Sequence, residues 1–344
     1  MKYRSLKWCD WDLSEIGFGA WGIGGGLWKG GTDEEALKAL HRASDLGLNF
    51  IDTALAYGQG HSEQLVGALL KEYPSVASAG ATGGPATASR SPLQRSRLFV
   101  ATKIPPKNQE WPARKRVPLN EVFPADHIIS CTEKSLKNLG VEQIDLQQLH
   151  VWSENWVDDP SWHETLLRLK REGKIAHFGI SINDHEPESA LEVVRRGWVD
   201  SVQVVYNIFD PTPSEKLFPL CLEKNVGVIA RCPFDEGALT GAITCETHFA
   251  EGDWRERYFT KERKKEIVAR IEKLKGLLKG AGVQTISELA LRFCLSHPAV
   301  SVVIPGMRTV AHVNQNLMIS DGTLLSDEIR NRLAAHAWPR NFYD

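Results

Sequence analysis

Short apolar runs alternate with amphipathic stretches along most of the chain. From Ala36 to Ala43 the apolar residues recur at helical spacing, which predicts a helix over residues 33–46. Gly47 ends this helix, and the apolar run over 48–52 directly after it predicts a buried strand. Helix-to-strand units of this kind are typical of proteins that pack helices against a parallel sheet.

The same alternation continues through the rest of the chain. Strands are expected at 16–21, 48–52, 98–103, 144–149, 174–181, 201–205, 226–231 and 300–304. Helices are expected at 33–46, 125–139, 162–172, 187–196, 213–224 and 286–295. Eight short strands in βα units with no linker favour a closed (β/α)8 TIM barrel of the α/β class over a doubly wound open sheet. We expect a single domain over residues 1–344, with a short N-terminal hairpin or strand segment.

Residues 74–97 break this pattern. They are rich in Ala, Gly, Ser, Thr and Pro and are too small and polar to build a core. They join a predicted helix to the strand at 98–103, so barrel topology places them on the N-terminal face, away from the chemistry. We expect a flexible insertion without a catalytic role.

Composition and charge exclude several classes of function. The chain has 344 residues, of which 42% are hydrophobic, which is enough for a full core. The net charge of -2 gives no basic field, so we expect no nucleic-acid or membrane partner. The N-terminus lacks the apolar core of a signal peptide, and no apolar run approaches the ~20 residues of a membrane span.

Cysteine usage points to a reduced, cytoplasmic protein. The six cysteines form no CxxC pair, and none stands at metal-ligand spacing with a histidine, so we expect no metal site. The sequence does not indicate an oligomeric state. The cysteines are Cys9, Cys131, Cys221, Cys232, Cys245 and Cys294.

Four chemically active residues stand at or just after predicted strand ends, where a barrel places its active site. They are Asp52, Tyr57, Lys103 and His150. Each has an ordinary structural explanation when taken alone: a cap, a packed ring, a snorkelling lysine and a buried histidine. An acid, a phenol, an ammonium and an imidazole at successive strand ends together indicate a catalytic site.

This set of groups suits the delivery of a proton to a carbonyl oxygen. An unperturbed phenol has a pKa of about 10, and we expect the ammonium of Lys103 to lower the pKa of Tyr57. Asp52 supplies a counter-charge for the ammonium, and His150 orients the substrate oxygen. No side chain supplies a hydride, so a nicotinamide or flavin is required.

The segments that carry these residues resemble the aldo-keto reductase superfamily, and the likeness spans nearly the whole chain apart from 74–97. The resemblance implies that Asp52, Tyr57, Lys103 and His150 form a catalytic tetrad with Tyr57 as general acid. The matching segments are GFGAWG at 17–22, NFIDTA at 49–54, YG at 57–58, SE at 62–63, ATK at 101–103 and LQQLH at 146–150.

The resemblance also implies a set of residues that bind the nicotinamide end of the cofactor. Ser181, Asn183 and Gln203 match the residues that hold the carboxamide, although Ile182 separates the first two here. Arg231 stands where many members stack an aromatic ring on the nicotinamide, and its planar guanidinium is also able to stack. The other residues implied for this part of the cofactor are Gly19, Ala20, Trp21, Asp52, Pro233, Phe234, Gly237, Leu239 and Gly241.

The segment IPGMRT at 304–309 resembles the part of the family that reads the adenosine end and its 2′-phosphate. Here Gly306 and His312 replace a frequent lysine and arginine, and Arg308 restores a positive charge suited to phosphate. We therefore expect NADPH (NADP+) as cofactor, with NADH as the second option. The residues implied for this end are Gly306, Arg308, His312, Gln315 and Asn316.

Tryptophans in the loops after the strands are expected to line an apolar substrate pocket. The expected pocket residues are Trp21, Tyr57, Trp111, His150 and Trp152, with Trp28 and Trp156 beside them.

The sequence thus predicts an NADPH-dependent oxidoreductase that reduces an aldehyde, ketone or sugar carbonyl to the alcohol, or catalyses the reverse oxidation. One alternative is a nicotinamide-binding regulatory subunit with little turnover, as in the potassium-channel β-subunits of this superfamily. Another is a Schiff-base aldolase that uses Lys103 on the same fold. The natural substrate is not indicated.

Overall fold

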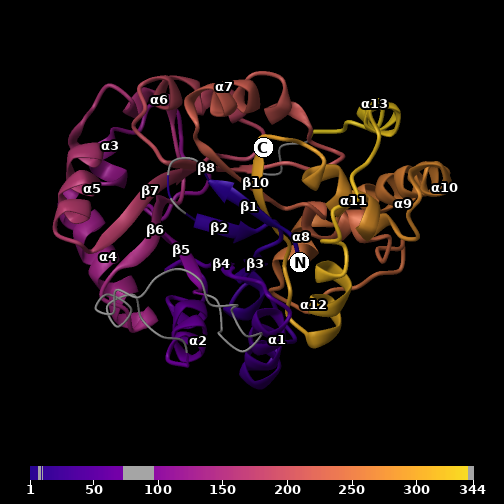
Figure 1. Cartoon of the computed structure of the whole chain (residues 1–344), viewed down its shortest axis with the longest axis horizontal. Coiled ribbons are helices and arrows are strands. Elements are labelled where there is room, and N and C mark those ends of the chain that lie inside the picture. The colour runs from indigo at the N-terminus through magenta and orange to yellow at the C-terminus, as the bar shows by residue number, and fades with distance from the viewer. Residues whose placement is uncertain (7–8, 10, 73–96, 340–344) are drawn as a thin grey trace, which may run out of the picture.

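Eight parallel strands form the centre of the molecule, and they neighbour one another in chain order (Figure 1). The computed structural model describes residues 1–6, 9, 11–72 and 97–339. The strands are β3 (Phe18–Gly19), β4 (Phe50–Asp52), β5 (Phe99–Ile104), β6 (Ile144–Leu149), β7 (Ile175–Ser181), β8 (Ser201–Val205), β9 (Gly227–Arg231) and β10 (Val300–Ile304).

The first and last strands of this sheet meet and close it into a barrel. Parallel bridges join Ile16 to Val303 and Gly19 to Gly306. The amide of Gly19 donates to the carbonyl of Pro305 at 3.0 Å, and a Cβ on Gly19 would lie 2.8 Å from the carbonyl oxygen of Ile304. Closure therefore requires glycine at this position, and the predicted (β/α)8 barrel is confirmed.

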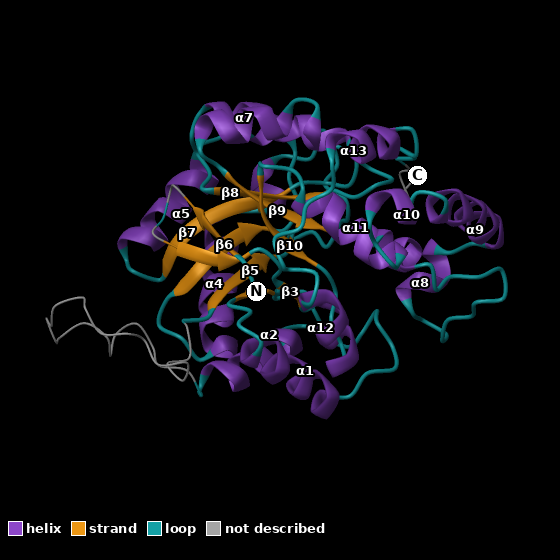
Figure 2. Cartoon of the chain, turned by 45° about the vertical axis from the view of Figure 1, so that its right-hand side comes forward, coloured by secondary structure: helices purple, strands orange, loops and turns teal. Residues whose placement is uncertain are grey.

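Helices surround the strands on the outside (Figure 2). Those that follow successive strands are α1 (Asp33–Asp45), α2 (His61–Leu70), α4 (Ala125–Leu139), α5 (Ser161–Arg171), α6 (Leu191–Arg195), α7 (Leu217–Lys224), α11 (Ile286–Leu295) and α12 (Val310–Leu317). Further helices are α3 (Leu119–Val122), α8 (Trp254–Tyr258), α9 (Lys261–Lys275), α10 (Leu278–Ala281) and α13 (Asp327–Ala334). Short 3-10 turns are η1 (Trp21–Ile23), η3 (Glu154–Trp156), η4 (Pro187–Ala190), η5 (Thr212–Ser214) and η6 (Asp235–Thr240).

Helix ends follow the local chemistry of the sequence. The Thr32 side chain accepts a hydrogen bond from the amide of Glu35 and caps the start of α1. Gly140 adopts a φ of 67° and ends α4 in the left-handed conformation. The helix expected at 213–224 begins only at Leu217, because the prolines at its start form the 3-10 turn η5 instead.

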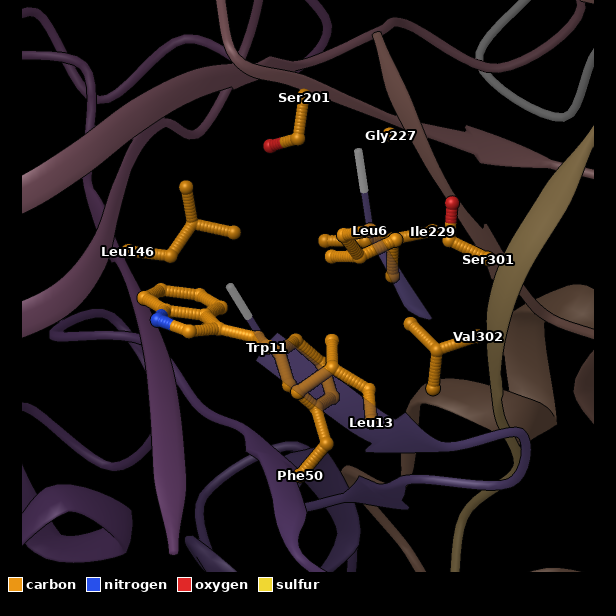
Figure 3. Close-up of a pocket in the computed structure, with 10 residues that line it drawn as sticks. All are labelled: Leu6, Trp11, Leu13, Phe50, Leu146, Ser201, Gly227, Ile229, Ser301 and Val302. Atoms are coloured by element: carbon orange, nitrogen blue, oxygen red, sulfur yellow. The ribbon is translucent and has the colours of Figure 1, made fainter. Parts of the chain in front are cut away.

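An N-terminal hairpin, as expected, closes the bottom of the barrel. Its strands β1 (Tyr3–Leu6) and β2 (Trp11–Ser14) pair in antiparallel fashion across the amino ends of the barrel strands. Trp11 and Leu13 of β2 project inward, and the Trp11 ring lies 4.7 Å from that of Phe99, centroid to centroid. Figure 3 shows these apolar side chains converging with Leu146 and Val302 on a small gap. The open end of the barrel is therefore the carboxyl end.

The expected insertion at 74–97 lies outside the described residues except for Arg97. The guanidinium of Arg97 donates to Asp145 at 2.5 Å and stacks over the ring of Phe99. These contacts lie at the amino ends of β5 and β6, opposite the carboxyl end of the barrel. No helix of the described ranges is both long and apolar enough to span a membrane.

Candidate active site

A large cleft opens at the carboxyl ends of the strands. Its volume is about 1470 Å³, above the ~300–1,000 Å³ of most small-molecule pockets, so it has room for a dinucleotide together with a substrate. Residues from the loops after β3, β4, β5, β6, β7, β9 and β10 line it. No group of three or more potential metal ligands forms within the described ranges.

The predicted tetrad residues come together at the base of this cleft. Lys103 is fully buried, and its Nζ donates to Asp52 Oδ2 at 2.6 Å and to the carbonyl of Thr53 at 2.7 Å. The same Nζ lies 3.4 Å from the hydroxyl of Tyr57. Gln203 Nε2 donates to the other carboxylate oxygen of Asp52 at 2.7 Å. These bonds fix the ammonium beside the phenol.

The loop that carries Tyr57 is held by short-range hydrogen bonds. The Tyr57 amide donates to the carbonyl of Ala54 at 3.0 Å. The Thr53 hydroxyl donates to Ser62 at 2.8 Å, and the Ser62 hydroxyl donates to the carbonyl of Ala20 at 3.0 Å. Ser62, at the start of α2, thereby ties the loop after β4 to the loop after β3, which explains why this serine accompanies the Tyr57 segment.

The electrostatics of Tyr57 differ from the expectation. Burial, followed by the nearby carboxylate of Asp52, raises the pKa of Tyr57 well above its ordinary value. The expected lowering by Lys103 does not prevail, because the phenol is desolvated and the charge of Lys103 is already paired with Asp52. Tyr57 is therefore protonated across the neutral range, which is the form that donates a proton.

His150 stands beside the phenol as a neutral ring. Its imidazole meets the ring of Tyr57 at 5.5 Å and that of Trp111 at 4.6 Å, centroid to centroid, both edge to face. Burial lowers the pKa of His150 well below its ordinary value, and the charges of Lys103 and Arg231 lower it further. A neutral imidazole retains one N–H, which suits it to hydrogen-bond a carbonyl oxygen.

Comparison with known proteins decides the family. The model of the aldo/keto reductase family matches residues 15–337, which is nearly the whole chain. The chain belongs to the aldo/keto reductase family. The expected resemblance and oxidoreductase class, which acts on carbonyl and alcohol groups, are confirmed.

Individual relatives agree with this assignment. Aldo-keto reductase YhdN of Bacillus subtilis is 30% identical over 95% of this chain and 91% of its own length. The NADH-specific methylglyoxal reductase of Escherichia coli is 29% identical over 95% of this chain and 98% of its own. The glycerol dehydrogenase AKR11B4 from Gluconobacter oxydans has a similar structure, with a TM-score of 0.74, 27% identity and coverage of 99% and 97%.

Most of the cofactor residues expected for this aldo/keto reductase line the cleft. They are Gly19, Trp21, Asp52, Ser181, Asn183, Gln203, Arg231, Pro233, Phe234, Gly237, Gly306, Arg308, His312, Gln315 and Asn316. Ala20, Leu239 and Gly241 do not line it. Ala20 and Leu239 are fully buried, and Gly241 adopts a φ of 76° to end η6. These three residues therefore lie behind the residues that line the cleft.

The amide of Asn183 is largely occupied by the protein itself. Its Oδ1 accepts from the amide of Ala113 at 3.2 Å, and its Nδ2 donates to the carbonyl of Ala113 at 3.0 Å and to Glu186 at 3.2 Å. Asn183 therefore fastens the loop that carries Trp111, and its contact with a carboxamide stays a prediction.

Arg231 is held in place by a partner that sequence reasoning missed. Its guanidinium forms an ion pair with Asp184 and donates to the carbonyl of Ile182 at 3.0 Å. Asp184 lies in the loop after β7 and carries no motif that would mark it in advance. The pair fixes the guanidinium at the cleft wall, where the resemblance places the stacking residue.

Two long loops meet across the mouth of the cleft. The Trp254 amide donates to the carbonyl of Leu27 at 2.7 Å, and Asp253 Oδ2 accepts from the Lys29 amide at 3.1 Å. The guanidinium of Arg255 lies 4.5 Å from the Trp28 ring centroid. Sequence reasoning missed Asp253 and Arg255, because a polar loop without a motif gives no signal of what it folds onto.

The tryptophans divide into cleft and core. Trp21 stacks on Tyr57 at 6.0 Å, centroid to centroid, and Trp111 is 39% exposed in the cleft wall. Trp152 and Trp156 are fully buried and do not line the cleft. The expectation that Trp152 lines the substrate pocket is wrong, because its ring packs at 5.2 Å from Trp162 of α5, behind the barrel wall.

Proposed function

We propose that this aldo/keto reductase reduces an aldehyde, ketone or sugar carbonyl with NADPH, and that it catalyses the reverse oxidation when the alcohol is supplied. The arrangement that supports the proposal most strongly is the buried Lys103 held between Asp52 and the protonated Tyr57. Two relatives act on a small carbonyl compound or polyol by their names, methylglyoxal and glycerol.

Tyr57 and His150 both face the space where the carbonyl oxygen would bind. The phenol donates its proton to the oxygen, and the neutral imidazole holds that oxygen by a hydrogen bond. The ammonium of Lys103, 3.4 Å from the hydroxyl, stabilises the phenolate that remains. Asp52 keeps the ammonium charged and in position. The bound nicotinamide supplies the hydride.

The cleft fits the dinucleotide in size and charge. Arg308 and Arg255 both line it. Burial, followed by the charge of Arg255, lowers the pKa of Arg308, and Arg255 is itself paired with Asp253 at 2.8 Å. The indole N–H of Trp28 is buried without a partner among the described residues. The guanidinium of Arg308 has no ion pair with a described residue and donates to the carbonyl of Lys29 at 2.8 Å. This cation and the unused indole donor favour an anionic ligand, and we assign Arg308 to the 2′-phosphate of NADPH.

NADH is the second option for the cofactor. The methylglyoxal reductase relative is NADH-specific by name, so a similar chain exists that uses the other nucleotide. Arg308 is the residue whose charge favours NADPH in this protein.

A titration of the native tryptophan fluorescence with NADPH and NADH tests the cofactor assignment. Trp21, Trp28 and Trp111 line the cleft, so a bound nicotinamide quenches their emission. We expect quenching by both nucleotides with tighter binding of NADPH. The complex is then assayed with methylglyoxal, glyceraldehyde and aromatic aldehydes. If neither nucleotide quenches, the oxidoreductase proposal fails.

The aldolase alternative conflicts with the environment of Lys103. A Schiff base requires a free amine that a substrate carbonyl reaches. Nζ of Lys103 is inaccessible and bonded to Asp52 and to the Thr53 carbonyl. A regulatory subunit would need the same nucleotide cleft but would show slow turnover with tight retention of the cofactor, which the aldehyde assay separates from an enzyme.

We also propose a reducing, cytoplasmic setting and a small-molecule carbonyl or sugar substrate, with no nucleic-acid or membrane partner. Five described cysteines, Cys131, Cys221, Cys232, Cys245 and Cys294, are free thiols. A thiol titration of the freshly purified protein under denaturing conditions, with six reactive groups expected, checks the redox state.

A further inference from the structure

The segment after β9 leaves the strand in a strained backbone. Cys232, Asp235 and Glu236 have φ values of 52°, 46° and 56°, although none of them is glycine. Side chains other than glycine are uncommon in this left-handed region, and such strain is typical of functional sites. The segment borders the nucleotide cleft along its whole length, since all three residues line it.

The two adjacent acids of this segment have different surroundings. Asp235 accepts a hydrogen bond from the Tyr258 hydroxyl at 2.6 Å and pairs with Arg263 at 3.1 Å. These bonds anchor the segment to α8 and α9. Glu236 has no ion pair with any described residue, and its Oε1 accepts only the weak thiol bond of Cys232 at 3.2 Å. The strained backbone therefore places the carboxyl of Glu236 in the cleft, where no cation among the described residues pairs with it.

The groups that face Glu236 come from four sides. Asp184 lies on the loop after β7, and Asp235 and Cys232 lie on its own segment. Arg231 at the end of β9 is the cation that acts on it, and that guanidinium is paired with Asp184. Burial raises the pKa values of two nearby phenols, Tyr57 after β4 and Tyr258 of α8, and the carboxyl of Glu236 adds to both shifts. Asp184 is paired with Arg231 and Asp235 with Arg263, whereas Glu236 has no ion pair with a described residue.

This position conflicts with the charge of the ligand. A dinucleotide carries at least two negative phosphate charges into the cleft, and an ionised carboxylate in the same wall repels them. Burial and the charges of Asp184 and Asp235 raise the pKa of Glu236 to about 7. The neutral acid is therefore accessible near physiological pH, and its second oxygen is available to carry the proton.

We propose that Glu236 is a cofactor-binding residue that acts as a neutral carboxylic acid, so that the cleft takes up a proton together with its dinucleotide. Oε1 keeps the thiol bond from Cys232, and the protonated Oε2 donates to an oxygen of the bound nucleotide. The proton comes from solvent and returns there when the cofactor leaves. The inference rests on the proposed function, since it needs a nicotinamide dinucleotide in this cleft.

The sign of the pH dependence follows from this linkage. Below the pKa that Glu236 has in the nucleotide-free protein, its carboxyl is already neutral, and the affinity for the nucleotide does not change with pH through this group. Above that pKa each binding event consumes a proton, so the dissociation constant rises by up to about tenfold per pH unit.

The test is titration calorimetry of NADH and NADPH at pH 8 in buffers of different ionisation enthalpy, HEPES and Tris. NADH is included because it lacks the 2′-phosphate, whose own titration would otherwise contribute. We expect the wild type to take up close to one proton per nucleotide and Glu236→Gln to take up close to none. The variant should also bind NADH several-fold more tightly than the wild type at pH 8.5 and equally well at pH 6.

Two controls complete the design. Glu256→Gln removes an equal charge from the exposed face of α8 and should leave the proton uptake unchanged. Glu236→Gly removes the carboxyl while relieving the positive φ, so it tests the same claim if the glutamine variant does not fold.

Each outcome has a separate meaning. Equal proton uptake by the wild type and both Glu236 variants overturns this inference and leaves the proposed function intact. A wild type that binds neither nucleotide at pH 6 or pH 8 overturns the proposed function itself. Loss of uptake in the Glu236 variants alone supports the assignment.

Discussion

The two ends of the barrel are built from the same strands but from opposite kinds of residue. On β4 the inward side chain changes from Phe50 to Asp52 within two positions, and on β9 it changes from Ile229 to Arg231. The amino end is an apolar cluster sealed by the hairpin, whereas the carboxyl end holds buried charges and a strained loop. One end thus supplies stability and the other supplies chemistry.

The largest effect should come from breaking the buried ion pair. Lys103→Met should lower kcat by about 10³-fold, because the phenolate of Tyr57 loses its stabilising charge. It should also destabilise the fold by about 3–5 kcal/mol, since Asp52 is left as an unpaired buried charge. Steady-state kinetics and urea unfolding measure both.

A double variant separates the two roles of this pair. Lys103→Met with Asp52→Asn removes both charges, so stability should return towards that of the wild type while kcat stays low. Recovery of activity in the double variant would contradict the catalytic role of Lys103.

The same substitution should have different consequences at the two ends of the barrel. Trp11→Ala empties a site in the apolar floor and should cost about 3–5 kcal/mol of unfolding free energy with little change in nucleotide affinity. Trp21→Ala, in the cleft beside Tyr57, should cost about 1 kcal/mol or less and should raise KM. Urea unfolding and nucleotide titration of both variants test these expectations. A larger loss of stability in Trp21→Ala than in Trp11→Ala would refute the division into a stabilising amino end and a chemically active carboxyl end.

At the adenosine end the expected effect is smaller and specific to one cofactor. Arg308→Ala should weaken NADPH binding about tenfold, because a charge-assisted bond to phosphate is lost, and should leave NADH binding within about twofold. Fluorescence titration with both nucleotides measures this difference. An equal loss of affinity for the two nucleotides would contradict the assignment of Arg308 to the 2′-phosphate.

The smallest expected effect is in the pH profile of the chemical step. Because the pKa of Tyr57 is raised, the phenol stays protonated as pH increases, so the rate of reduction at saturating NADPH should be flat from pH 6 to pH 9. Single-turnover oxidation of NADPH across this range measures it. A decline that begins near pH 7 would show that the phenol ionises too easily for a general acid.

The sequence was sufficient to predict the repeated strand-and-helix units and the residues at the carboxyl ends of the strands. Strand periodicity predicted the barrel, and the strand ends predicted Asp52, Lys103 and His150, because parallel strands bring their ends to one face. The placement of Trp152 was not predictable, since a loop tryptophan points into the cleft or behind the wall according to packing that its neighbours in sequence do not encode.

Contacts between distant loops were also beyond sequence reasoning. The pairing of Arg231 with Asp184 and the meeting of Trp254 with Leu27 depend on how two loops approach in space. The pKa of Tyr57 depended on burial, which the presence of Lys103 in the sequence could not reveal. The polar end of the barrel was therefore harder to predict than the apolar end.

The most direct test of Tyr57 as the general acid is the turnover of Tyr57→Phe with NADPH and the best aldehyde substrate of the wild type. We predict that kcat falls by about 10²–10⁴-fold while NADPH quenches tryptophan fluorescence with nearly unchanged affinity, because only the proton donor is removed. A variant that retains the wild-type kcat would contradict the assignment of Tyr57 as the general acid at the carboxyl end of the barrel.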